Sequence, residues 1–278
     1  METNIKQANT NQQVLSAAEK ALAIQEKALG PDHPNVAISL NNLALLYYTQ
    51  GAYAKAEPLY QRSLAIREKI LGPDHPDVAI SLNQLASLYY TQGSDVKAAL
   101  LFQRALAIRE KALGPDHPLV AQSLNNLAVL YDEQGAYAKA EPLYQRCLAI
   151  RAKALGPDHL RVTGSLNNLA VLYQAQGADA KAEPLYQRCL AIREKGLGPD
   201  HPLVAQSLNN LASLYYAQGA YAKAEPLLQR SLAIREKALG SDHPLVAQSL
   251  HNLAVLYRAQ GADAKAEPFY QRSLALRE

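Results

Sequence analysis

Apolar residues recur at helical spacing along the chain, in two successive stretches that together fill residues 34–72. The first stretch runs from Pro34 to Gln50, and its apolar positions lie three or four residues apart at Val36, Leu40, Leu43, Ala44 and Tyr47. This spacing predicts an amphipathic helix with one buried face. We call this helix and its equivalents A helices.

A second amphipathic stretch follows Gly51, a residue type that commonly ends a helix because it adopts the left-handed conformation. Its inward side is formed by Ala56, Leu59, Tyr60, Ser63, Leu64, Ile66 and Leu71. The stretch predicts a second helix, of a type we call B, that ends at Gly72. The following turn leads to Pro76, which suits the first position of a helix because its missing N–H is not needed there.

The two-helix unit recurs with a period of 42 residues, marked by glycines at 30, 72, 114, 156, 198 and 240 and again at 51, 93, 135, 177, 219 and 261. A fixed period of this size indicates a stacked array in which each unit buries its apolar face against its neighbours. We therefore predict an all-α fold with a polar tail over residues 1–13 and a single array over residues 14–278. The array consists of a lone B-type helix at 14–29 and repeats at about 34–72, 76–114, 118–156, 160–198, 202–240 and 244–278.

The unit follows the tetratricopeptide pattern of W-x2-L-G-x2-Y, A-x3-F and P with conservative replacements, at Leu40, Leu43, Ala44, Tyr47, Ala56, Tyr60 and Pro73. The strings SLNNLALLY, QGAYAKAEPLYQRSLAIREK and LGPDHPxVA resemble the tetratricopeptide (TPR) repeats of kinesin light chains and their bacterial relatives, over nearly all of residues 14–278. The resemblance implies a right-handed superhelical solenoid of antiparallel helix pairs, with a concave groove lined by A helices that holds short peptides. It does not imply motor transport, because the sequence has no coiled-coil region for joining a heavy chain.

Two series of equivalent A-helix positions are the candidate peptide-binding residues. The asparagine series is Asn41, Asn83, Asn125, Asn167, Asn209 and His251, and the Tyr48 series is Tyr48, Tyr90, Asp132, Gln174, Tyr216 and Arg258. Asparagine amides can donate and accept at once, which suits either an extended peptide backbone or the alignment of neighbouring helices. The variation of the Tyr48 series within a constant frame favours local recognition of a ligand, and neutral drift at exposed positions is the alternative.

Aspartate and histidine recur together six times, from Asp32 and His33 to Asp242 and His243. One pair per repeat cannot converge on a single metal ion, so we interpret these residues as caps of the proline-initiated helices. Cys147 and Cys189 occupy equivalent positions one repeat apart, too far for a disulfide, and are expected to be buried thiols. The sequence has no nucleophile elbow, phosphate-binding loop or paired zinc ligands, which indicates a protein without enzymatic activity, metal or cofactor.

The charge balance, 28 basic and 25 acidic residues for a net charge of +3, does not favour nucleic acid as a partner. Basic residues such as Lys55, Arg62, Arg67 and Lys69 lie on B helices, and we expect them to form a charged outer surface beside a nearly neutral groove. The charges in the groove are then acidic at Asp132 and Glu133 and basic at His251 and Arg258. A ligand that is mainly apolar or aromatic, with a carboxylate near Arg258 and any basic residue near Asp132, would fit this pattern.

No apolar run approaches the roughly 18 residues of a membrane span, and residues 1–13 do not resemble a signal peptide, so a cytoplasmic location without membrane contact is expected. The predicted function is a protein or peptide-binding scaffold. The alternative is a regulatory or sensing segment of a larger effector or signalling protein. The array ends on a B helix without a polar capping helix, so this end is expected either to continue in a longer protein or to self-associate end to end.

Overall fold

The computed structural model describes residues 2–277, and their side chains from residue 12 onward. The described residues form helices joined by short turns, without strands. The helices are α1 (Glu2–Leu29), α2 (Pro34–Thr49), α3 (Tyr53–Leu71), α4 (Pro76–Thr91), α5 (Asp95–Leu113), α6 (Pro118–Glu133), α7 (Tyr137–Leu155), α8 (Val162–Ala175), α9 (Asp179–Leu197), α10 (Pro202–Ala217), α11 (Tyr221–Leu239), α12 (Pro244–Ala259) and α13 (Asp263–Ala275). The all-α prediction is confirmed.

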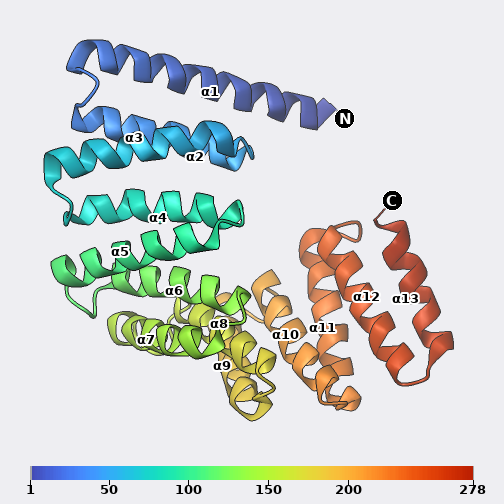
Figure 1. The fold of residues 1–278 in the computed structure, drawn as a ribbon. Helices are drawn as coiled ribbons and strands as arrows, with labels where there is room; N and C mark the ends of the chain where they lie inside the picture. Colours follow the sequence, from blue (N-terminus) through green and yellow to red (C-terminus); the bar gives the residue numbers. More distant parts are fainter. Residues whose placement is uncertain (1, 278) are drawn as a thin grey trace. The chain divides into compact units, whose positions relative to one another are not determined.

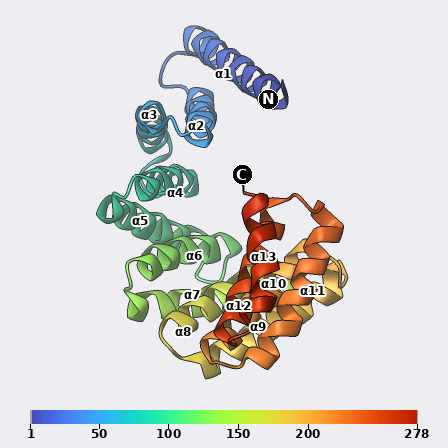
Figure 2. The same cartoon turned by 90° about the vertical axis from the view of Figure 1, so that its right-hand side faces the viewer.

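The chain divides into two compact units, residues 1–136 and residues 137–278. Unit 1 contains α1 to α6, and unit 2 contains α7 to α13. Within each unit the helices follow one another in chain order, each packed against the next (Figures 1 and 2). The even-numbered helices are the A helices and the odd-numbered helices are the B helices.

Small and branched apolar residues form the interfaces between A and B helices. In unit 1, Val78, Ala79 and Leu82 of α4 pack with Ala105 and Ile108 of α5, and each is at most 4% exposed. In unit 2, the equivalent cluster joins α10 to α11. Burying a valine, leucine or isoleucine contributes about 1.5–3 kcal/mol, so the recurrent apolar stripe is what stabilises each helix pair.

A histidine caps the start of A helices, and a glycine ends B helices, in most repeats. His201 Nδ1 accepts a hydrogen bond from the backbone N–H of Leu203 over 3.1 Å, which caps the start of α10. Gly240, with a φ of 88°, ends α11 in a conformation that other residues rarely adopt. The predicted caps are therefore confirmed, with the histidine as the capping residue.

Two helix starts differ from the sequence prediction. Helix α1 begins at Glu2 rather than near Val14, because residues 2–13 contain neither glycine nor proline to interrupt it, so the expected tail belongs to the helix. Helix α8 begins at Val162, because Leu160 stands where the other repeats have the proline that starts the A helix. The prediction that both units form one continuous array stays a prediction.

Candidate functional site

The asparagine series links successive A helices. Asn210 Nδ2 of α10 donates to Asn167 Oδ1 of α8 over 2.6 Å, and Asn252 Nδ2 of α12 donates to Asn209 Oδ1 of α10 over 2.6 Å. In unit 1 the bond from Asn126 to Asn83 is longer, at 3.5 Å. These bridges place successive A helices side by side, so the helix-alignment role considered for the series is confirmed at these positions.

The same asparagines keep part of their hydrogen-bonding capacity. Asn125, Asn167 and Asn209 are half-buried, whereas Asn41 and Asn83 are only 6% and 8% exposed. Among the described residues, no protein group accepts a hydrogen bond from Nδ2 of Asn167 or Asn209. A side-chain amide has two N–H donors, so these two residues can align helices and still donate to a ligand.

The bridge is missing where the repeat departs from asparagine. Gln84 of α4 occupies the position of Asn210 and Asn252, and its longer side chain does not join the neighbouring helix. As a result, Asn41 Oδ1 and Gln84 Oε1 are both buried without a hydrogen-bond partner. Such an orphaned polar atom costs about 1–3 kcal/mol of stability.

The Tyr48 series has varied local partners. Tyr48 Oη lies 2.8 Å from Thr91 Oγ1, and Gln174 Oε1 accepts a hydrogen bond from Tyr186 Oη over 2.9 Å. Burial, and next a hydrogen bond with Glu133, raise the pKa of Tyr90 to about 12. The remaining members are Asp132, which is half-buried, and Tyr216 and Arg258, which are exposed. The series is thus accessible in part, most of all in unit 2.

The A-helix surface of unit 2 contains a cavity of about 290 Å³. It lies among α10, α11 and α12, and its lining includes Asn209, Tyr216 and His251 from the predicted residues. Leu228 of α11, at its floor, was missed by the sequence analysis. The sequence does carry a signal for it, because Leu228 is the one non-aromatic residue of its series. The equivalent positions hold Tyr60, Phe102, Tyr144, Tyr186 and Tyr270.

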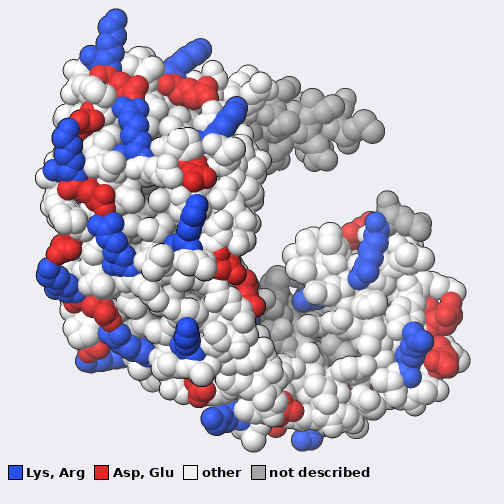
Figure 3. Space-filling model, viewed as in Figure 1, with Lys and Arg blue, Asp and Glu red and all other residues white. Residues whose placement is uncertain are grey.

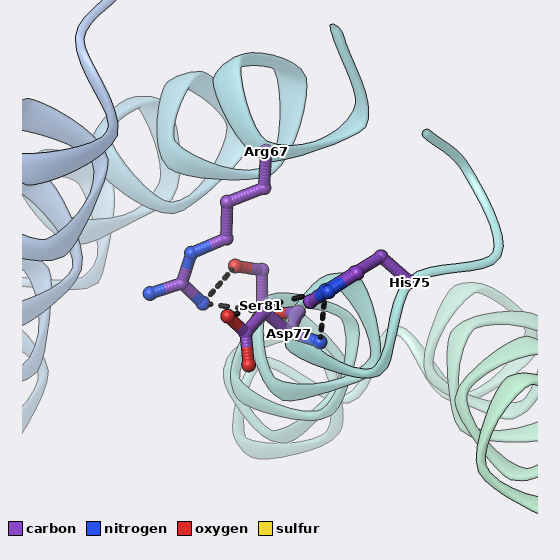
Figure 4. Close-up of polar contacts among 4 residues, drawn as sticks. All are labelled: Arg67, His75, Asp77 and Ser81. Atoms are coloured by element: carbon purple, nitrogen blue, oxygen red, sulfur yellow. Dashed lines mark hydrogen bonds and ion pairs between the residues drawn. The ribbon is translucent and has the colours of Figure 1, made fainter. Parts of the chain in front are cut away.

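The arginines equivalent to Arg67 do not lie on the charged outer surface that the sequence analysis expected. Arg109, Arg193 and Arg235 are 4–7% exposed. Arg109 Nη1 donates to the carbonyl oxygen of Leu119 over 2.8 Å and to Ser123 Oγ over 2.9 Å. Figure 4 shows the same arrangement for Arg67, which donates to Asp77 O over 3.1 Å and to Ser81 Oγ over 2.8 Å.

This part of the prediction was wrong because carbonyl and hydroxyl oxygens at the start of the next A helix accept hydrogen bonds from Nη1 of the guanidinium inside the helix interface, although Arg109 Nε is buried without a partner. Burial lowers the pKa of Arg109 and of Arg235. Arg235 also lines a cavity of about 350 Å³ beside Gln206 of α10 and Gln248 of α12. Arg235 of the B helix α11 thus brings a buried positive charge to the lining of a cavity beside two A helices, and the nearly neutral groove stays a prediction.

Other charged residues do lie outside and pair from one repeat to the next. Lys69 and Lys237 approach Asp32 and Asp200 at 2.5 Å, and Arg104 approaches Glu68 at 2.6 Å. Figure 3 shows basic and acidic side chains next to one another along the edge of unit 1 where B helices turn into A helices. Asp32 and Asp200 of the Asp-His pairs thus form ion pairs while the histidines cap helices.

The two cysteines are free and buried, as expected. Cys147 Sγ lies 3.5 Å from Ser165 Oγ, and burial raises the pKa of both thiols. Within the described part of the chain, His, Cys, Asp and Glu form no group of three that could hold a metal ion. No helix of the described residues is long and apolar enough to cross a membrane.

Helix pairs repeated every 42 residues, with capped turns and aligned A helices, define an α-helical repeat scaffold. A family model for the tetratricopeptide repeat matches residues 11–69, 48–111, 97–153, 134–195, 161–237 and 205–278. The chain belongs to the tetratricopeptide repeat family, whose repeats form scaffolds for protein interaction.

Solved structures confirm the kinesin light chain-like character of the repeats. BtubC (BKLC) from P. vanneervenii is 27% identical, with a TM-score of 0.73 over 83% of this chain and 92% of that chain. A kinesin light chain-like protein of Podosopora anserina with nearly identical TPR-like repeats is 33% identical, with a TM-score of 0.65 over 73% of this chain and 96% of that chain.

A signal transduction ATPase from Pyrococcus horikoshii with a tetratricopeptide repeat sensor, PH0952, shares the fold at 18% identity. Its TM-score is 0.75 over 98% of this chain and 40% of that chain. No curated protein matches the sequence.

Proposed function

We propose that the chain is a scaffold that binds an extended segment of another protein along its A helices. The observation that carries the proposal is the dual use of Asn167 and Asn209. Their Oδ1 atoms accept the bridges from Asn210 and Asn252, and their Nδ2 atoms have no partner among the described residues. The bridges hold these donors in a fixed orientation, which lowers the entropy that binding would cost.

The spacing of the donors suits an extended polypeptide. Packed helices lie about 8–10 Å apart, and an extended chain advances about 3.3 Å per residue. In the polyproline II conformation, with three residues per turn and about 3.1 Å per residue, every third carbonyl faces the same side, so successive asparagines of the series match every third residue of such a segment. The backbone carbonyl oxygens of that segment are acceptors for the free amide N–H groups, whereas a helical ligand would satisfy its own carbonyls.

Exposed apolar residues lie beside the amides. In unit 2, Val171, Leu203, Tyr216 and Leu245 of the A helices are 37–44% exposed, and Arg258 adds one exposed positive charge. In unit 1, Ile38 and Ile80 are similarly exposed on A helices. Apolar surface next to oriented donors favours a ligand that is mainly apolar or aromatic, with a carboxylate near Arg258.

The test begins with peptides selected from a random phage-displayed library on the immobilised chain, followed by affinity measurements on purified peptides. The double variant Asn167→Asp and Asn209→Asp keeps an oxygen acceptor for each bridge and removes the N–H donors. The matched control is the double variant Gln176→Glu and Gln218→Glu, which makes the same amide-to-carboxylate change at exposed residues at the ends of α8 and α10.

Loss of two hydrogen bonds of about 1 kcal/mol each corresponds to roughly 30-fold weaker binding. We expect this loss in the asparagine variant and a change below about twofold in the control, as exposed charges are screened by salt. Equal affinities for both variants would overturn the assignment of these donors to the ligand.

A further inference from the structure

Two departures from the repeat meet at one cavity in unit 2. Leu228 of α11 replaces an aromatic residue that the other five repeats carry, and His251 of α12 replaces an asparagine. Both line the cavity of about 290 Å³ described above. Because they lie on different helices, 23 positions apart in the sequence numbering, their meeting at one cavity is a property of the fold.

The cavity has an apolar floor. Ala212 and Leu228 are 0% and 3% exposed, and Val255 of α12 completes the apolar lining. In the preceding repeat the position of Leu228 is held by Tyr186, which is buried and donates to Gln174. Leucine lacks the outer part of that ring and its hydroxyl, and Tyr216 stands at the position of the acceptor Gln174, so the space of the ring is vacated while the polar wall differs.

The wall carries polar groups without protein partners. Neither ring nitrogen of His251 nor Oγ of Ser213 has a hydrogen-bond partner within the described part of the chain, and the imidazole only touches the Tyr270 ring edge-on, with centroids 5.8 Å apart. Asn209 Nδ2 is free beside them. His251 is half-buried, so its unpartnered ring nitrogens are costly and a ligand hydroxyl could supply the missing partner, whereas Ser213 is exposed and adds an accessible hydroxyl.

We infer that this cavity binds a single tyrosine side chain of a bound polypeptide. The phenol ring would lie against Ala212, Leu228 and Val255, and its hydroxyl would exchange hydrogen bonds with His251 or Ser213. A volume of about 290 Å³ is at the lower limit of small-molecule pockets, which span roughly 300–1,000 Å³, so it suits one side chain rather than a whole cofactor. The inference rests on the proposed function in taking the tyrosine from a bound polypeptide. The preference for a phenol rests on the cavity lining alone.

The first experiment uses p-cresol, the side-chain analogue of tyrosine, and detects its binding to the full chain by saturation-transfer NMR. A fragment of this size should bind with a dissociation constant on the order of millimolar. Leu228→Tyr restores the residue of the other repeats and fills the cavity, so the transfer signal should be lost. Phe102→Tyr adds a tyrosine at the equivalent position of α5 and should leave the signal unchanged.

A second variant guards against misfolding of the first. His251→Phe keeps a flat ring but removes both ring nitrogens, and it should weaken p-cresol binding at least threefold while affecting toluene, which has no hydroxyl, much less. Undiminished binding of p-cresol to Leu228→Tyr, or no binding to the unaltered chain, would overturn the inference.

The source of the phenol is decided with N-acetyl-tyrosinamide. This capped amino acid should bind at least as tightly as p-cresol, because its amides reach the free donor of Asn209. If only p-cresol binds, the pocket takes a free small phenol and the polypeptide assignment is wrong. If the library selection yields no peptide while p-cresol still binds, the proposed peptide-binding function is rejected and the phenol-binding cavity is kept. If selected peptides bind equally well after replacement of their tyrosines by alanine, the tyrosine-binding inference alone is rejected.

Discussion

Leu160, in the turn before α8, packs against Gly196 near the end of α9. A Cβ atom on Gly196 would lie 2.9 Å from Leu160 Cδ2 and 3.0 Å from its Cγ, closer than atoms normally approach. In the next repeat the same two positions hold Pro202 and Ala238. The glycine therefore accommodates the bulkier residue, and each replacement explains the other.

This pair predicts a coupling between two substitutions. Gly196→Ala alone should lower the free energy of unfolding by about 1 kcal/mol, because the overlap outweighs the usual gain of alanine over glycine in a helix. In a Leu160→Pro background the same change should raise it by up to about 1 kcal/mol. Urea denaturation of the four proteins measures the coupling, and equal effects of Gly196→Ala in both backgrounds would contradict the packing argument.

The missing bridge between α2 and α4 can be restored. Gln84→Asn should place an amide donor against Asn41 Oδ1, as in the other bridges, and raise the free energy of unfolding by about 1 kcal/mol. Thermal and urea denaturation check the change. Gln84→Ala is the control, since it removes the glutamine without building the bridge, and an asparagine variant no more stable than the alanine variant would count against this account.

Burial should separate two arginines of the same helix. Arg109→Ala in α5 removes a buried guanidinium with its hydrogen bonds and leaves space behind, so a loss of about 2–4 kcal/mol is expected. Arg104→Ala removes a half-exposed partner of Glu68 and should cost less than about 1 kcal/mol. Urea denaturation of the two variants measures both losses of stability. Similar losses for Arg109→Ala and Arg104→Ala would show that burial does not determine the contribution of an arginine.

The exposed pair of Asp200 and Lys237 should make a pH-dependent contribution. A hydrogen bond with Lys237 lowers the pKa of Asp200, and the same bond raises the pKa of Lys237. Stability from the aspartate is thus present above its unfolded pKa of about 3.9 and is lost as pH falls through its lower folded value. Stability from the lysine is present below about 10.4 and is lost as pH rises through its higher folded value.

Asp200→Asn should therefore lower the melting temperature at neutral pH and low salt, with a difference that shrinks in strong acid, in strong base and at high salt. Asp242→Asn is a matched control, because among the described residues no lysine contacts this equivalent aspartate. A difference for Asp200→Asn that stays constant across pH would contradict the ion-pair explanation.

The helix pairs and most of their boundaries, apart from the starts of α1 and α8, could be predicted from the sequence because six copies repeat the same apolar spacing, glycines and prolines. The position of the buried arginines could not. A helical pattern treats Arg109 as polar and assigns it to solvent, and only the structure shows that Leu119 and Ser123 of the next helix receive its donors. The cavity at Leu228 was readable in principle, but its meaning depends on His251 lying beside it.

The asparagine series shows a different limit. Its capacity to donate and accept was evident from the residue type, yet sequence reasoning left open whether it serves helices or a ligand. In the structure the oxygen of Asn209 serves a helix and its nitrogen is free, so the two interpretations apply to different atoms of one side chain.

The bonds between repeats also bear on how such a chain can change length. The asparagine bridges join residues 43 apart, and the ion pair of Lys237 with Asp200 joins residues 37 apart. Each bond thus reaches only the adjacent repeat, and its donor and acceptor recur at the same positions in other copies. Duplication or deletion of one 42-residue segment in the gene would recreate these bonds at the new junction, so the number of repeats can evolve without redesign of the interfaces.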